Sequence, residues 1–105
     1  MRILVVSDTH GDLRSLIKAV DAQRKAEIIV HCGDGEEQQR FLKDNYKDKM
    51  IVAVRGNCDW NSFFPSKEIF KACGKTIFVT HGHLYDAKSG LYRITSAARE
   101  AGADI

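Results

Sequence analysis

The sequence is poor in proline and cysteine and lacks any long hydrophobic run, and each shortage excludes a class of protein. One proline in 105 residues, together with 44% hydrophobic residues, argues against a disordered, collagen-like or low-complexity chain. The longest apolar runs, such as residues 3–6, are far shorter than the roughly 20 residues that cross a bilayer. The three cysteines are an odd number, which favours reduced thiols over a disulfide framework. We therefore expect a cytoplasmic protein that does not contact membranes.

The chain also has little net charge. Its 16 basic and 14 acidic side chains give a formal net charge of +2, which is too small to indicate nucleic acid as a stable partner. The length fits a single domain over residues 1–105, and the sequence contains no internal repeat, linker or charge block.

Hydrophobic periodicity predicts an α/β fold. Short β-branched runs predict strands over residues 2–7, 27–31, 50–54, 68–72 and 76–80. Helical spacing predicts one helix that begins after an Asp12 N-cap and ends near Lys25, a second over 36–45, and a last one that stops at Gly102. A tight turn over 73–75 joins the last two strands, and residues 102–105 begin a further strand. The alternation of strands and helices predicts a sheet that is parallel at least in its first half.

Four of the predicted strands are each followed by side chains that can bind metals. These are Asp8 and His10, then Asp34, then Asn57 and Asp59, then His81 and His83. The carboxyl ends of strands form one rim of an open α/β sheet, and ligands bind at that rim. Turn chemistry explains Asp, Asn and Gly after strands, but it does not require imidazoles after two of them. The pattern therefore favours a metal site over coincident turns.

The ligand types also indicate which metals fit. Carboxylate, amide and imidazole ligands suit divalent ions such as Mn²⁺, Fe²⁺ or Zn²⁺. The three cysteines lack Cys-x-x-Cys spacing, which argues against a structural zinc site. A central carboxylate at Asp34 can bridge two ions about 3.5–4 Å apart, a geometry that clamps an in-line displacement at phosphorus.

Four motifs occur in an order that resembles the calcineurin-like metallophosphoesterases: Asp8-Thr9-His10, Gly33-Asp34, Gly56-Asn57-Cys58-Asp59 and Thr80-His81-Gly82-His83. The cysteine in the third motif and the short spacing resemble the small bacterial and archaeal phosphodiesterase branch. The resemblance implies a sandwich of mixed sheets flanked by helices. It also implies hydrolysis of a small phosphodiester or phosphomonoester.

The same resemblance implies a role for each motif residue. A metal-bridging hydroxide would attack phosphorus between two divalent ions, of which we expect Mn²⁺ first and Ni²⁺, Fe²⁺ or Zn²⁺ as alternatives. Asp34, Asn57 and His83 would be the catalytic residues. The metal ligands would be Asp8 and His10 for the first ion, Asn57 and His81 for the second, and Asp34 for both.

Several residues near these motifs allow two interpretations. His83 either lies near the substrate or is an ordinary loop histidine, while His31 is better explained as a half-buried structural residue than as a ligand. Arg55 either neutralises a substrate phosphate or is a surface arginine. Cys58 is interpreted as a compact loop residue. The aromatic residues after the third motif form a wall for a leaving group or pack against the domain or a partner: Trp60, Phe63 and Phe64.

The family's fifth motif, Gly-His-Thr-His, has no counterpart in this sequence. In the family it supplies one histidine to each ion, so we expect three protein ligands for each ion and weak metal binding. We expect residues 1–105 to be the N-terminal portion of a longer domain, either as part of a longer polypeptide or as a frame-shortened product of it, with the C-terminal part of the second sheet missing. Exposed strand edges would then favour a homodimer. The alternative function is a non-catalytic interaction scaffold of the same fold.

Overall fold

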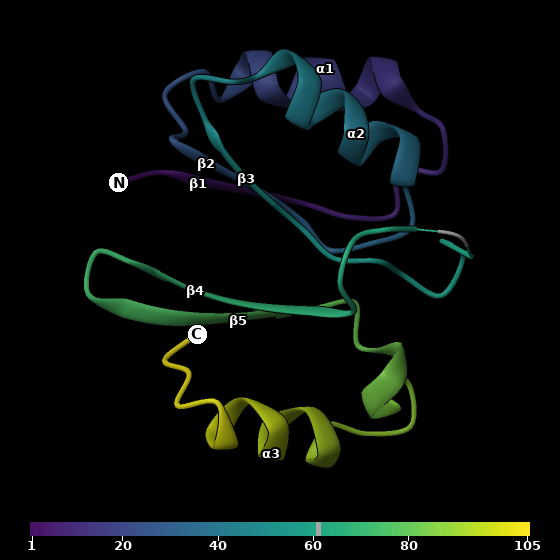
Figure 1. The fold of residues 1–105 in the computed structure, drawn as a ribbon, viewed down its shortest axis with the longest axis vertical. Coiled ribbons are helices and arrows are strands. Elements are labelled where there is room, and N and C mark those ends of the chain that lie inside the picture. Colours follow the sequence, from purple (N-terminus) through teal and green to yellow (C-terminus); the bar gives the residue numbers. More distant parts are fainter. Residues whose placement is uncertain (61) are drawn as a thin grey trace.

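Two β-sheets lie face to face between helices in the computed structural model, which describes residues 1–60 and 62–105 (Figure 1). The elements in chain order are β1 (Ile3–Val6), α1 (Leu13–Ala22), β2 (Ile28–His31), α2 (Glu36–Asn45), β3 (Met50–Ala53), β4 (Lys67–Ala72), β5 (Lys75–Thr80), the 3₁₀ turn η1 (His83–Tyr85) and α3 (Tyr92–Glu100). Strands β1, β2 and β3 are parallel with β2 in the centre, whereas β4 and β5 form an antiparallel pair. Helices α1 and α2 cover the first sheet, and α3 lies outside the second. The predicted mixed α/β sandwich is therefore confirmed.

The central strand β2 is buried along its whole length because it has packed layers on both faces. Ile28 and Val30 point into a cluster shared with β3, β4 and β5, between the two sheets. Ile29 points the opposite way and packs with Leu16 and Leu42 under α1 and α2. One strand thus belongs to both hydrophobic cores.

Helix α1 begins as predicted but ends earlier. The Asp12 carboxylate accepts a hydrogen bond from the Ser15 backbone N–H at 3.1 Å, which is the predicted N-cap. The helix ends at Ala22 rather than near Lys25, because the Gln23 N–H bonds back to both Ala19 and Val20 and tightens the last turn. The end therefore depends on backbone hydrogen bonds that the apolar spacing does not encode.

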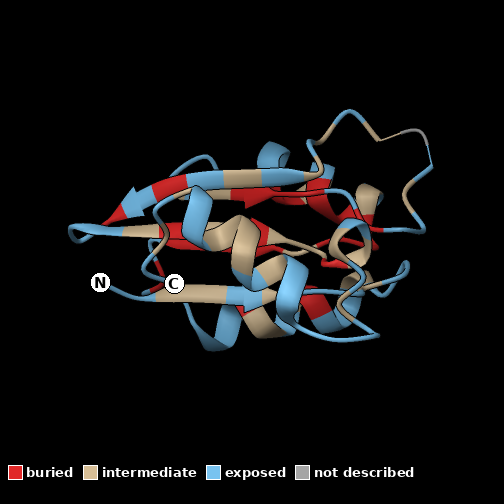
Figure 2. Ribbon diagram, turned by 90° about the horizontal axis from the view of Figure 1, so that it is seen from below, coloured by how far each residue is buried: buried red, intermediate tan, exposed pale blue. Residues whose placement is uncertain are grey.

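The second sheet is a two-stranded hairpin. Its turn residues Cys73 and Gly74 both have positive φ, 51° and 76°, as tight hairpin turns require. Residues 103–105 run beside β5, where the Phe78 N–H donates to the Ile105 carbonyl at 2.8 Å, but they do not form the predicted strand. Figure 2 shows α3 with only intermediate and exposed residues. Among the described residues, no helix is long and apolar enough to cross a bilayer.

Candidate metal centre

The proposed ligands come from loops that follow the strands at one edge of the sandwich. Asp8 and His10 lie in the β1–α1 loop, Asp34 follows β2, Asn57 follows β3, and His81 directly follows β5. The structure brings four of these five side chains together. The His10 Nε2 atom lies 3.6 Å from Asp8 Oδ1 and 3.8 Å from Asp34 Oδ2, and His81 Nε2 lies 3.3 Å from Asp34 Oδ2. One ligand atom each from Asp8, Asp34 and His81 lies within 4.8 Å of the other two.

Three of these residues have a strained backbone. Asp8, His10 and Asp34 have φ values of 55°, 40° and 60°, in the left-handed region. Each such residue costs on the order of 1–3 kcal/mol and persists only where the surrounding contacts hold it, which is common at functional sites. The strain therefore marks the same loops that carry the converging side chains.

His81 is oriented by a backbone carbonyl. Its Nδ1 atom lies 2.9 Å from the Cys32 carbonyl oxygen, which can only accept, so Nδ1 carries the proton. The Nε2 atom then faces the Asp34 carboxylate, and in the neutral ring its lone pair is free to bind a cation there. A histidine whose Nδ1–H is held by a carbonyl and whose Nε2 faces carboxylates is the usual arrangement of a metal ligand. The donor set therefore fits a divalent cation.

The Asp8 carboxylate favours the ionised form. A hydrogen bond from the Ser7 hydroxyl lowers the pKa of Asp8 below its usual value, and the nearby His81 ring acts in the same direction. Asp34 is only 4% exposed and accepts a hydrogen bond from the Cys58 backbone N–H at 2.8 Å. The Asp34 carboxylate is thus buried between the rings of His10 and His81.

Two glycines allow this close approach. A methyl group at Gly56 would overlap the Asp34 carboxylate, and one at Gly33 would lie 2.8 Å from His81 Nδ1 and from the Gly56 backbone. Only glycine leaves room for these contacts, and Gly33 also has a positive φ of 115°.

Asp59 has a different position from the one its place in the sequence indicates. Its carboxylate does not join the cluster but accepts backbone N–H groups from Asp34, Gly35, Glu36 and Gly56 at 2.7–3.3 Å. It therefore caps the start of α2 and ties the β2–α2 loop to the β3–β4 loop. The sequence carries no local signal for this role, because the bonded groups lie up to 25 residues away.

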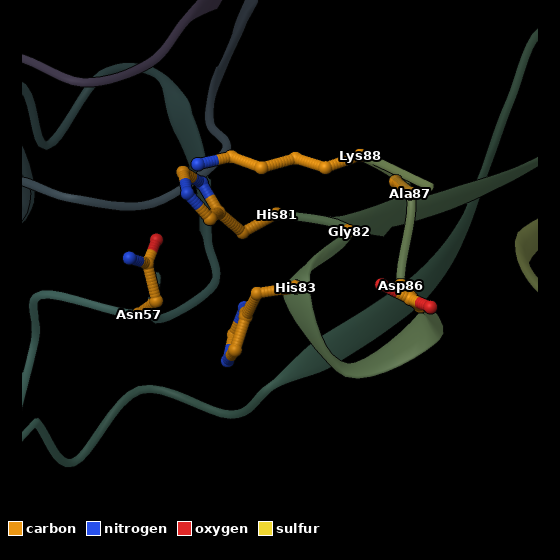
Figure 3. Close-up of a pocket in the computed structure, with 7 residues that line it drawn as sticks. All are labelled: Asn57, His81, Gly82, His83, Asp86, Ala87 and Lys88. Atoms are coloured by element: carbon orange, nitrogen blue, oxygen red, sulfur yellow. The ribbon is translucent and has the colours of Figure 1, made fainter. Parts of the chain in front are cut away.

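Asn57, the fifth predicted ligand, lies on the wall of a cavity of about 200 Å³ beside His81. His83 and Lys88 line the same cavity, and the Lys88 side chain extends across it toward the His81 ring (Figure 3). The His81 and His83 ring centroids are 5.6 Å apart, and burial lowers the pKa of His83. Sequence reasoning missed Lys88, since a lysine in a loop is no signal by itself.

The remaining candidates lie around the centre. His31 is completely buried rather than half-buried, with both ring nitrogens hydrogen-bonded. Cys58 is exposed, and slight desolvation together with the Asp34 charge raises the pKa of its thiol, which favours a loop residue over a thiolate. The Lys43 Nζ atom of α2 lies 4.9 Å from the centroid of the Phe64 ring. Trp60 is 89% exposed. Arg55 is exposed.

A sandwich of two sheets with carboxylates and imidazoles at one edge is the architecture of metal-dependent phosphoesterases. The chain belongs to the calcineurin-like phosphoesterase superfamily, whose domain matches residues 1–105. The resemblance drawn from the four motifs is therefore confirmed. This family uses divalent metals, in agreement with the Asp8, Asp34 and His81 group.

Two curated relatives match most or all of the chain. It is 34% identical to the probable metallophosphoesterase YsnB of Bacillus subtilis, over all of this chain and 60% of that protein. It is 27% identical to the phosphodiesterase MJ0936 of Methanocaldococcus jannaschii, over 90% of this chain and 69% of that protein. The chain thus spans about 60–70% of the length of these relatives. That it is the N-terminal portion of a longer domain stays a prediction.

Two solved structures have the same fold. A predicted phosphoesterase from Streptococcus pneumoniae superposes with a TM-score of 0.79 at 28% identity, over 96% of this chain and 56% of that chain. A Vps29 mutant from Entamoeba histolytica gives a TM-score of 0.75 at 18% identity, over 99% of this chain and 61% of that one. The second likeness is one of fold alone.

Proposed function

We propose that the protein is a divalent-metal-dependent phosphoesterase whose substrates are small phosphodiesters. Two ions, Mn²⁺ ahead of Ni²⁺, Fe²⁺ or Zn²⁺, would be held by Asp8, His10, Asp34, Asn57 and His81. The observation that carries the proposal is the convergence of the Asp8, Asp34 and His81 ligand atoms within 4.8 Å. Bound ions would stabilise charge on the phosphoryl oxygens and lower the pKa of a coordinated water.

The charge around the rim supports one orientation of the substrate. The hollow that adjoins His10 and Trp60 is lined by the carboxylates of Asp34, Glu36, Glu37 and Asp59. The hollow beside His81 carries the Lys88 ammonium, which has no hydrogen bond or ion pair within the described part of the chain. A phosphate anion is repelled by the first lining and attracted by the second. The phosphoryl oxygens would therefore face Lys88.

His83 would contact the substrate from the same wall. Burial lowers its pKa, so its ring is neutral near pH 7 and acts through a hydrogen bond rather than a charge. Asn57, on the wall of the same cavity near the His81 ring, would contribute its amide oxygen (Figure 3). These two residues and Asp34 are the proposed catalytic set.

The choice of phosphodiesters over phosphomonoesters rests on similarity. The archaeal relative carries the name phosphodiesterase, and 27% identity over 90% of this chain supports the same substrate class here. A phosphomonoester is the second candidate substrate. We also propose a cytoplasmic location, which the unpaired cysteines support.

The test is the Mn²⁺-dependent hydrolysis of bis(p-nitrophenyl) phosphate by this chain, with p-nitrophenyl phosphate as the monoester. We expect a Mn²⁺-dependent rate that favours the diester and falls at least about 100-fold in Asp34→Asn, because a neutral amide cannot replace the central carboxylate. Asp48→Asn, an exposed carboxylate on a distant loop, is the matched control and should leave the rate unchanged.

Calorimetric titration of Mn²⁺ separates the alternatives. Ion binding without hydrolysis would favour the interaction scaffold over the enzyme. Equal rates in wild type and Asp34→Asn would contradict the proposed role of Asp34. A chain that binds no divalent ion would contradict the metal centre itself.

A further inference from the structure

Behind the proposed metal centre, on the side of α2, the half-buried Thr9 and the buried His31, Gln38 and Gln39 form a polar cluster, which we call the His31 cluster. His31 and Gln39 are fully buried, and Gln38 is 4% exposed. His31 ends the buried strand β2, where its neighbours along the strand are apolar. Burying an imidazole there costs free energy unless both ring nitrogens find partners.

The partners of His31 determine which ring nitrogen carries the proton. The Gly33 backbone N–H can only donate, and its nitrogen lies 3.1 Å from Nδ1, so Nδ1 must be the acceptor. The Gln39 amide nitrogen lies 2.9 Å from the same Nδ1 atom and also donates to it. The proton of the neutral ring is therefore on Nε2. Burial lowers the pKa of His31, in agreement with a neutral ring.

The hydrogen bonds then continue in one direction. Nε2–H donates to the Thr9 hydroxyl oxygen at 3.0 Å, and the Thr9 hydroxyl donates to Gln38 Oε1 at 3.1 Å. The same Gln38 oxygen accepts the Gly11 backbone N–H, also at 3.1 Å. Each hydrogen bond from His31 through Thr9 to Gln38 thus has a donor and an acceptor in one arrangement of protons, whereas Gln39 Oε1 in the same cluster is buried without a partner among the described residues.

The ends of this path are next to the proposed ligands. Thr9 lies between Asp8 and His10 in the chain, and Gly33 directly precedes Asp34. Direct backbone bonds join the same loops, from the Asp8 N–H to the Gly33 carbonyl at 2.8 Å and from the His10 N–H to the Asp34 carbonyl at 3.1 Å. The three ligands have strained positive φ angles that would relax without such support. The His31 imidazole thus links the β1–α1 loop to the β2–α2 loop on the side of α2.

We propose that His31 is a positioning residue. Its Nε2–H tautomer holds the Thr9 hydroxyl and the Gly33 amide at a fixed separation, and this keeps Asp8 and His10 at the distance from Asp34 that a divalent ion requires. The inference rests on the proposed metal centre. Loss of such an outer partner lowers metal affinity by about 10–100-fold, whereas a purely structural residue would change stability alone.

The first measurement needs no variant. In the metal-free wild-type chain, the ¹⁵N chemical shifts of His31 should show an unprotonated Nδ1 and a protonated Nε2 at pH 7. A protonated Nδ1 would overturn the inference, because the Thr9 hydroxyl would then have lost its donor.

The second measurement is the Mn²⁺ affinity of Thr9→Val and Thr9→Ser by calorimetry. Valine keeps the shape of threonine but removes the hydroxyl, so we expect affinity to fall at least about tenfold. Serine keeps the hydroxyl and should stay within about twofold of wild type. Ser15→Ala, which removes a hydroxyl hydrogen bond to Asp12 at the start of α1, is the control for a general loss of stability.

The outcomes separate this inference from the proposed function. Wild-type binding that Thr9→Val leaves unchanged would overturn the positioning role alone. A wild-type chain that binds no divalent ion would overturn the metal centre and this role together. If Thr9→Val does not fold, Gln38→Met, which breaks the path at its other end, should show the same fall in affinity, and an unchanged affinity there overturns the role.

Discussion

The site residues are held by more contacts on the side of the parallel sheet β1–β3, here called the first side, than on the side of the hairpin β4–β5, called the second side. On the first side, helices α1 and α2 bury Leu16, Val20 and Leu42 against the parallel sheet, whereas α3 on the second side has no fully buried residue in the described structure. The loops of the first side are tied by the His31 cluster and by the Asp59 carboxylate. Among the described residues, the ring of His81 on the second side makes one hydrogen bond, to the Cys32 carbonyl. We therefore expect the first side to define the geometry of the proposed metal centre, and the second to shape the proposed substrate pocket.

Core truncations on each side are expected to show the largest contrast. Leu16→Ala removes a side chain that is 2% exposed beneath α1 and should destabilise the protein by about 3–5 kcal/mol. Ile94→Ala removes a half-buried side chain on α3 and should cost less than about 1.5 kcal/mol. Chemical unfolding of both variants measures the difference. Equal losses would show that α3 is packed as firmly as α1.

Asp59→Asn tests whether the negative charge of Asp59 is needed to hold the β2–α2 loop against the β3–β4 loop. The amide keeps one acceptor oxygen and turns an N–H₂ group toward backbone donors, so at least one bonded N–H group loses its partner. We expect a loss of about 2–3 kcal/mol in unfolding free energy, together with weaker Mn²⁺ binding. Asp44→Asn, an exposed carboxylate on α2, should change neither quantity.

Acid should weaken the first side through His31. Burial lowers the folded-state pKa of His31 below its usual value of 6.5, so protons bind the unfolded chain more readily. The resulting stability is present above about pH 6.5 and is lost as the pH falls toward the folded-state pKa, with a slope of at most about 1.4 kcal/mol per pH unit for this group. His83, whose pKa is also lowered by burial, contributes with the same sign.

Unfolding curves between pH 7.5 and 5 measure this loss in wild type and in His31→Gln. The variant has no imidazole at this position and should lose less stability over the same interval. A slope that His31→Gln leaves unchanged would show that other groups, His83 among them, account for the acid sensitivity.

Lys88→Met should show the smallest effect and a different kind of effect. Removing the ammonium takes away one charged contact to the substrate, so we expect KM for bis(p-nitrophenyl) phosphate to rise about tenfold. The Mn²⁺ affinity and the unfolding free energy should not change. Lys75→Met, at the tip of the β4–β5 hairpin, is the matched control. A fall in metal affinity instead would show that the second side also sets the metal geometry.

The sequence was enough to predict the strands and the sheet edge that carries the site, but not the contacts that fix the loops at that edge. Alternation and strand order were enough to predict β1 to β5 and to group Asp8, Asp34 and His81, because strand ends meet at one edge. The roles of Asp59 and Lys88 and the full burial of His31 depend on residues that are distant in the chain. The early end of α1 depends on a backbone turn rather than on side-chain pattern. None of these leaves a periodic signal.

Asp34, which follows β2, and His81, which follows β5, meet at the edge of the two stacked sheets, with 3.3 Å between Asp34 Oδ2 and His81 Nε2. An ion held by both would bind only when the sheets are docked, so its binding free energy would add to the docking free energy by mass action. At an ion concentration 100 times the dissociation constant, this linkage is worth about 2.7 kcal/mol. The second sheet, whose outer helix α3 has no fully buried residue among those described, would then melt together with the first in the presence of the ion, and ahead of it without the ion.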